Sequence, residues 1–330
     1  MKPAVNVELD RLRQLTAALK QNLELCGKEA TIDAVHDIRT GTRRIEAMLD
    51  TNLRERSQPV LSGSVPRKPD LQPDALAKTA QRWPRLLKRI RRTAAPVRDL
   101  DVHRKLLEKF KPRKKAVVPG ESAVESVDAL ATLPNPIEQQ ADDLDAWLKQ
   151  TRHDQAQPLM KAAPKWAPRV EAQLASLEEA MRRSPLRRRA SRSAAVTALE
   201  AFARLATQMQ QLDAGNLHDF RKGAKKARYM AESGGADEQA GAVGKALKRL
   251  QDEIGDWHDW LVLAEEAREA LGSHGLELTA LIEKERDMHY ALAMNITERM
   301  RGRLMGEWQA LGARPRSRTR PRLPARNEVS

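Results

Sequence analysis

The chain has 330 residues, of which 41% are hydrophobic, and this composition argues against disorder of the whole chain. Its net charge of +14 and isoelectric point near 10.1 predict an anionic partner: a nucleic acid, polyphosphate or a membrane surface. Cys26 is the only cysteine, which excludes an internal disulfide and a zinc site built from cysteines.

Membrane insertion and secretion are not expected from this sequence. No apolar run approaches the roughly 20 residues that span a bilayer. The opening residues, MKPAVNVELDRL, contain no hydrophobic signal core. We therefore expect a soluble cytoplasmic protein.

Helical patterns follow one another along the chain, and strand-like alternation is nearly absent. The apolar period predicts a first helix over about 5–25 and a second over about 31–50, with Thr31 or Asp33 as its N-cap. The stretch SQPVLSGSVPRKPDLQP at 57–73 is typical of a surface loop. Two further helices complete a first half of about 5–110, and they are expected near 74–95 and 97–110.

The second half is expected to follow a linker of about 111–136, which contains Pro134 and Pro136. It spans about 137–302 and starts with a helical stretch over about 137–183, which three prolines interrupt: Pro158, Pro164 and Pro168. The helices after that stretch are expected near 190–211, 216–232, 238–254, 256–272 and 276–302. We thus predict one helical domain over 1–302 and an Arg-rich disordered tail over 303–330.

A short basic motif occurs twice in the chain. Residues 35–48 read VHDIRTGTRRIEAM and residues 217–230 read LHDFRKGAKKARYM, so that His36 and His218 are 182 positions apart (218 minus 36). A motif repeated at this distance predicts an internal duplication.

Each copy of the motif forms a row of cations on one helix face. At about 100° per residue the charged positions share a stripe, and apolar residues such as Ile38 and Phe220 lie behind it. The stripes comprise His36, Arg39, Thr40, Arg43 and Ala47 in the first copy and His218, Arg221, Lys222, Lys225 and Tyr229 in the second. Like charges one turn apart repel unless an anion lies over them, and the Arg, Lys and His side chains of the stripes are types that bind phosphate oxygens. The repeated pattern favours a phosphate site over a solvated helix face.

A second pair of segments supports the duplication. LKRIRRTAAPVRDLDV at 87–102 lies over LKRLQDEIGDWHDWLV at 247–262, 160 positions further on (247 minus 87). The first half therefore has 22 more residues between its motifs (182 minus 160), and the loop at 57–73 accommodates them. The repeated cations are expected to contact the anion: Lys88 and Arg89 with Lys248 and Arg249, and in addition Arg82 and Arg85.

These segments resemble the CHAD family, the conserved histidine α-helical domain, named for histidines that begin an H-x-x-R-x-x-x-[RK]-[RK] helix. The R-D-L-D sequence at 98–101 and the W-H-D-W sequence at 257–260 are similar to that family as well. The resemblance covers about 5–302 and implies an all-α fold of two four-helix-bundle halves related by a pseudo-two-fold axis. It also implies a basic central channel that binds inorganic polyphosphate. The chain departs from the pattern in two ways: Gly41 and Gly223 lie in helix interiors, and Lys225 and Lys226 replace arginines, which keeps the charge but loses the planar fork.

The repeat and the resemblance together predict non-catalytic binding of inorganic polyphosphate, without cofactor or metal. The resemblance also implies targeting to polyphosphate granules. The predicted binding residues are His36, Arg39, Arg43, Arg44, Arg82, Arg85, Lys88, Arg89, His218, Arg221, Lys222, Lys225, Lys226, Tyr229, Lys248 and Arg249.

Two alternatives stay open. Sequence-nonspecific nucleic-acid binding fits the charge and the Arg-rich tail at 313–326, although single-strand binders use aromatic platforms and this chain has two Tyr and three Phe. The Arg-rich cluster at 181–192 is either an entry to the anion channel or a solvated turn. A metal-dependent phosphohydrolase would use the His-Asp pairs at 36–37, 218–219 and 258–259. Against hydrolysis, helix neighbours point about 100° apart, and arginines repel a divalent ion.

The remaining polar and aromatic residues have simpler interpretations. The repeated aspartates are expected to orient nearby cations: Asp37, Asp99, Asp219 and Asp259. Four histidines without a repeat partner are interpreted as ordinary helix residues: His103, His153, His274 and His289. Trp257 and Trp260 are expected in the core.

Overall fold

The computed structural model describes residues 4–57, 75–111, 135–183, 193–232, 234 and 237–313. These residues form helices, with no strand among them, so the all-α prediction is confirmed. The helices are α1 (Ala4–Lys28), α2 (Ile32–Ser57), α3 (Ala75–Leu107), α4 (Pro136–Arg183), α5 (Ala194–Gln208), α6 (Leu217–Glu232), α7 (Glu238–Leu271) and α8 (Leu276–Ala313), with short 3-10 turns at Glu108–Phe110 and Gly272–Gly275.

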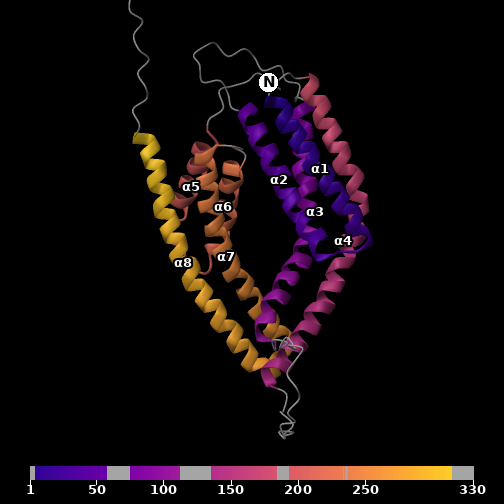
Figure 1. The fold of residues 1–330 in the computed structure, drawn as a ribbon, viewed down its shortest axis with the longest axis vertical. Coiled ribbons are helices and arrows are strands. Elements are labelled where there is room, and N and C mark those ends of the chain that lie inside the picture. The colour runs from indigo at the N-terminus through magenta and orange to yellow at the C-terminus, as the bar shows by residue number, and fades with distance from the viewer. Residues whose placement is uncertain are drawn as a thin grey trace, which may run out of the picture.

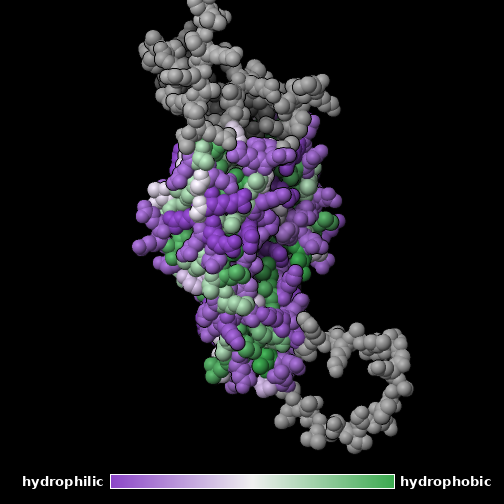
Figure 2. All heavy atoms as spheres, turned by 60° about the vertical axis from the view of Figure 1, so that its left-hand side comes forward, coloured by the Kyte–Doolittle hydropathy of each residue, from purple (hydrophilic) through white to green (hydrophobic). Residues whose placement is uncertain are grey.

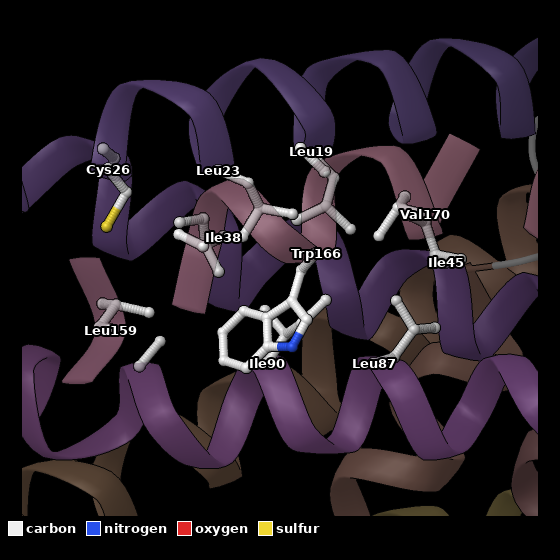
Figure 3. Packing of buried hydrophobic residues seen from close by; sticks show 14 of the residues in the cluster. Leu19, Leu23, Cys26, Ile38, Ile45, Leu87, Ile90, Leu159, Trp166 and Val170 are labelled. Atoms are coloured by element: carbon white, nitrogen blue, oxygen red, sulfur yellow. The ribbon is translucent and has the colours of Figure 1, made fainter. Parts of the chain in front are cut away.

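The helices form two groups, α1–α4 and α5–α8, which converge at the lower end of Figure 1. Helix α4, which was expected to begin the second half, packs with α1 and α3 and belongs to the first half, because its apolar stripe shares their core. The first group packs around a core to which all four helices contribute (Figure 3). Leu19 and Leu23 of α1 and Ile38 and Ile45 of α2 recur at helical spacing, so each helix buries one stripe. Trp166 of α4 lies among them.

The second group has its own core, contributed by α5, α6, α7 and α8. Phe202 of α5 meets Phe220 of α6 edge to face, with ring centroids 5.9 Å apart. The polar faces of the helices remain outside, and Figure 2 shows mostly hydrophilic side chains on the face that it presents. Each half therefore has a hydrophobic core of its own, as the two-bundle prediction requires.

A third apolar cluster joins the two halves where the lower ends of α3, α4, α7 and α8 meet (Figure 1). Leu107 and Leu148 come from the first half, and Trp260 and Leu263 come from the second. The predictions that Trp257 and Trp260 belong to the core are confirmed, since each is 3% exposed. Because this cluster contains buried side chains from both halves, it holds the halves in one relative position.

His103 differs from its interpretation as an ordinary helix residue. Its ring is buried at the same junction, and Nδ1 lies 2.7 Å from Oε2 of Glu266 on α7. This contact joins α3 of the first half to α7 of the second half.

A buried ion pair fastens α3 to α4 in the first half. Nε of Arg152 donates to Oδ1 of Asp101 at 2.5 Å, and Nη2 of the same guanidinium donates to the carbonyl oxygen of Ala30 at 2.7 Å. The Asp101 side chain is fully buried. One arginine thus ties the α1–α2 turn, α3 and α4 together.

Several predicted helix boundaries are wrong because prolines do not interrupt the helices. α3 runs through Pro84 and Pro96, and α4 runs through all three of its internal prolines. Pro96 and the prolines of α4 lie on exposed positions. Water can bond the carbonyl oxygens that a solvent-facing proline releases, while the opposite face stays packed. The predicted break between 254 and 256 is absent as well. Helix α7 continues through Gly255, which is buried.

The ends of several elements need similar adjustment. α2 begins as predicted, since the hydroxyl of Thr31 accepts from the amide of Ala34 at 3.3 Å. α8 continues past 302 to Ala313, so 303–313 are helical and do not belong to a disordered tail. Leu304 is fully buried there, which explains the extension. Pro136 starts α4 and does not lie in the linker. The loop at 58–73, most of the linker, the cluster at 184–192 and the tail from 314 lie outside the described residues.

The two glycines of the repeated motif have different surroundings, and this gives a first testable prediction. A Cβ on Gly41 would lie 3.8 Å from Leu19 Cβ, whereas one on Gly223 would lie 2.5 Å from Leu205 Cδ1. Gly41→Ala is therefore expected to raise the free energy of unfolding by about 1 kcal/mol through helix propensity. Gly223→Ala is expected to lower it, because overpacking typically costs about 1–3 kcal/mol. Urea denaturation of both variants checks this, and equal shifts would contradict it.

Candidate anion-binding site

Helices α2 and α6, which contain the two basic motifs, face each other across the two halves (Figure 1). Some of their Cα atoms lie within 8 Å of one another. The two predicted stripes therefore do not lie on opposite exteriors. The space between α2 and α6 is the place where their cations can act together.

Four basic side chains lie near one another at this contact, and we call them the seam cluster: Arg39, Arg43, Arg221 and Lys225. The pKa of Lys225 is lowered to about 6, first by burial and then by the charges of the three arginines and of Arg228. Burial also lowers the pKa of Arg43, as do the charges of Arg39, Arg91 and Arg221, while Tyr229 opposes this shift. The charges of α2 and α6 thus act on one another. Exposed cations far apart would not show this effect, because water and salt screen their repulsion.

Arg39 is held in place from α3. Its Nη1 donates to the carbonyl oxygen of Ala95 at 3.0 Å and to Oδ1 of Asp99 at 2.6 Å. The Arg39 side chain is 16% exposed, and Asp99 is mostly solvated. The predicted role of Asp99, to orient a nearby cation, agrees with this geometry.

Arg221 is held by the backbone of α7. Its Nε donates to the carbonyl oxygen of Gln251 at 3.0 Å. A Cβ at Gly255 would lie only 2.3 Å from Arg221 Nη2, so the guanidinium occupies space that only glycine leaves free. This role of Gly255 cannot be predicted from the sequence, because a glycine within a helical pattern indicates close packing but not which side chain packs against it.

Three aspartates on α7 also act on Arg221. Burial lowers the pKa of Arg221, and the carboxylates of Asp259, Asp256 and Asp252 oppose that shift. The aligned positions of α3 hold Asp99, Pro96 and Arg92, so only one of the three acids recurs. Asp256 itself has a raised pKa, caused first by burial and then by Asp259 and other nearby acids. The second half is therefore more acidic beside the seam cluster than the first, which the motif comparison missed.

The two motif histidines occupy different environments. His36 is exposed, and its Nε2 lies 3.5 Å from the hydroxyl oxygen of Thr40. His218 is half-buried and stacks on His258 of α7, with ring centroids 4.2 Å apart and an interplanar angle of 28°. Burial, followed by the charges of His258, Lys222 and Arg221, lowers the pKa of His218 to about 4. Identical sequence register therefore does not give the two histidines the same chemistry.

The lowered pKa of His218 predicts a pH effect on stability. Between about pH 4 and pH 6.5 the unfolded chain binds a proton at this residue and the folded chain does not, so stability falls as the pH falls through this range. His218→Gln is expected to lose less stability than the native chain between pH 7 and pH 4.5. Urea midpoints at both pH values measure this difference, and parallel losses would contradict it.

The other predicted cations are exposed, and no contact among the described residues places them against the seam cluster. Lys222 pairs with Asp219 at 2.9 Å, and Lys248 pairs with Asp252. Tyr229 is nearer, since it acts on Arg43 and lies 4.8 Å from the guanidinium carbon of Arg228. The exposed positions are His36, Arg44, Arg82, Arg85, Lys88, Arg89, Lys222, Lys226, Lys248 and Arg249.

The His-Asp pairs do not form a metal centre within the described part of the chain. No group of three or more His, Cys, Asp or Glu side chains there is arranged to hold a metal ion. His258 Nδ1 lies 3.9 Å from Asp259 Oδ1, while Asp219 pairs with a lysine. Among the described residues, no helix combines the length and apolar character that crossing a bilayer requires.

Comparison with known proteins agrees with this architecture. Residues 71–268 match the CHAD domain family. That segment begins after α2, so it contains the second basic motif and not the first. The fold is similar to the crystal structure of the CHAD domain from the plant Ricinus communis, with a TM-score of 0.51 and 21% sequence identity over 92% of this chain and 89% of that one. No curated protein matches the chain.

Proposed function

The chain belongs to the CHAD domain family, and from this premise we propose that it binds inorganic polyphosphate between its two halves, without chemical change to the ligand. The resemblance given above implies this ligand for the family. The internal duplication and a continuous basic channel are part of the same proposal.

The observation that carries the proposal is the charge of the seam cluster. Asp99 bonds Arg39, but among the described residues no carboxylate forms an ion pair with Arg43, Arg221 or Lys225. Burying like charges together costs free energy unless an opposite charge joins them. A polyanion between α2 and α6 would supply that charge to both helices at once.

Linear polyphosphate suits this arrangement better than nucleic acid does. It carries a charge at each unit and has no base or sugar, so a receptor needs cations on rigid helices and few aromatic rings. Nucleic acids also offer phosphates, but single-strand binders stack bases on aromatic side chains. Tyr229 is an aromatic residue that acts on Arg43 of the seam cluster, and its ring already packs against Arg228.

A competition experiment tests the proposal. Labelled single-stranded RNA or duplex DNA is bound at low salt, and long-chain polyphosphate is added while fluorescence anisotropy is recorded. We expect displacement at a phosphate concentration at least tenfold below that of unlabelled nucleic acid. Similar displacement by both would support the nucleic-acid alternative, and failure of polyphosphate to bind would refute the proposal.

Binding without chemistry is tested separately. Polyphosphate incubated with the protein and Mg²⁺ or Mn²⁺ should release no orthophosphate above the protein-free control. Release that disappears in a His36→Ala, His218→Ala double variant would establish the phosphohydrolase alternative. A cytoplasmic location at polyphosphate granules is proposed from the family resemblance alone, and a fluorescent fusion in cells with and without polyphosphate tests it.

A further inference from the structure

We infer that capture of a polyanion at the seam cluster adds a proton to Lys225, so that the affinity of the site is set by pH. This inference rests on the proposed function and concerns the regulation of the same site. It starts from one difference between the two motifs. Where the first copy has Arg43, the second has Lys225, and an amine can lose its proton at a pH where a guanidinium cannot.

The geometry surrounds Lys225 with positive charge. The residue is half-buried on α6, where Arg221 precedes it by four positions and Arg228 follows it by three, so each lies about one helical turn away. Helix α2, which carries Arg39 and Arg43, contacts α6, and the charges of both arginines act on Lys225. It forms no ion pair among the described residues. A free ammonium group at this position is therefore opposed both by desolvation and by repulsion.

Among the described residues, no carboxylate of the neighbouring helices forms an ion pair with Lys225, and several of them act on other cations. On α7, Asp252, Asp256 and Asp259 act on Arg221. On α5, Glu200 pairs with Arg204 of the same helix. On α3, Asp99 accepts a hydrogen bond from Arg39. A bound anion is thus the group that can stabilise the ammonium form.

The direction of the pH effect follows from linkage. Without ligand, the pKa of Lys225 is about 6, so the amine is mainly neutral at pH 7.5. A polyanion at the cluster raises that pKa because it favours the charged form. Between the two pKa values binding takes up one proton, so affinity falls as the pH rises, by up to about tenfold per pH unit. Below about pH 6 the residue is charged in both states, and this contribution vanishes.

Lys225→Arg isolates the effect, because arginine keeps the positive charge and does not titrate in this range. Affinity for long-chain polyphosphate is measured from pH 6 to pH 9 for the native chain and for the variant. We expect the native affinity to fall more steeply, and the difference in slope to approach one proton. Since the variant retains every other titrating group, including His218, those groups cancel in the comparison. Equal slopes would overturn the inference.

Calorimetry counts the proton directly. At pH 7.5 the binding enthalpy is measured in two non-phosphate buffers of different ionisation enthalpy, and the dependence gives the protons taken up. The native chain should take up close to one proton more than Lys225→Arg. The same uptake in both would refute proton capture at Lys225 while leaving polyphosphate binding intact. Absence of binding at every pH would instead refute the proposed function.

A ligand-free measurement keeps the inference testable in either case. Competitive labelling with acetic anhydride followed by mass spectrometry reports the fraction of each lysine that is a neutral amine. In the free protein, the labelling of Lys225 should rise through a midpoint near pH 6. A midpoint close to the usual lysine range, about pH 10, would refute the inference.

Discussion

Replacing Arg43 and Arg221 together by glutamine is expected to weaken binding of long-chain polyphosphate by about 100-fold at low salt. The two arginines come from opposite halves, and both belong to the seam cluster. A hydrogen bond to a charged group contributes about 1.5–3 kcal/mol. Two such losses at the lower bound amount to about 3 kcal/mol, and each 1.4 kcal/mol is about tenfold in affinity. Isothermal titration calorimetry measures the change.

A matched control variant distinguishes the loss of contacts at the seam cluster from the effect of a lower net charge on binding. Arg11 on α1 and Arg299 on α8 are exposed, and their replacement by glutamine removes the same net charge. This control variant should lose only a few-fold in affinity through the weaker overall field. The slope of log affinity against log salt should also be shallower for the seam variant than for the control, because contacting cations release more counterions. Equal losses in both variants would show that polyphosphate binds the charged surface without using the seam.

The second large effect concerns stability. Arg152→Met is expected to lower the free energy of unfolding by about 3–5 kcal/mol, because it leaves the Asp101 carboxylate buried without a partner. It also removes the hydrogen bond to the carbonyl oxygen of Ala30, which joins the α1–α2 turn to α4. Urea denaturation followed by circular dichroism measures the loss.

Arg13→Met provides the comparison, since Arg13 pairs with Glu178 on the surface and is 50% exposed. That variant should lose less than about 1 kcal/mol, as exposed pairs do. Adding Asp101→Leu to Arg152→Met should recover much of the loss, because a buried ion pair can be exchanged for apolar residues at little cost. A loss for Arg152→Met no larger than that for Arg13→Met would mean that Asp101 finds another partner or water.

Sequence periodicity predicted the helices well and their ends less well. Apolar spacing located the helix cores, and Thr31 was found as an N-cap from the side chain that can bond the first turn. The prolines of α3 and α4 misled the prediction because their effect depends on which face meets water. α8 was predicted too short because Leu304 is buried by residues of other helices, which a local pattern cannot show.

The candidate site divides in the same way. The sequence alone determined that two helices carry cations one turn apart in matching register, because a stripe follows from spacing along a single helix. The tertiary structure decided which of those side chains come together: Arg39, Arg43, Arg221 and Lys225 cluster, while Arg44, Lys226 and the four predicted cations of α3 remain exposed.

It also decided how the two copies differ. Stacking on His258 sets the chemistry of His218, and the missing Cβ of Gly255 leaves room for Arg221. The physical reason is that side-chain spacing is a local property, whereas burial and electrostatic repulsion depend on atoms brought together from distant parts of the chain.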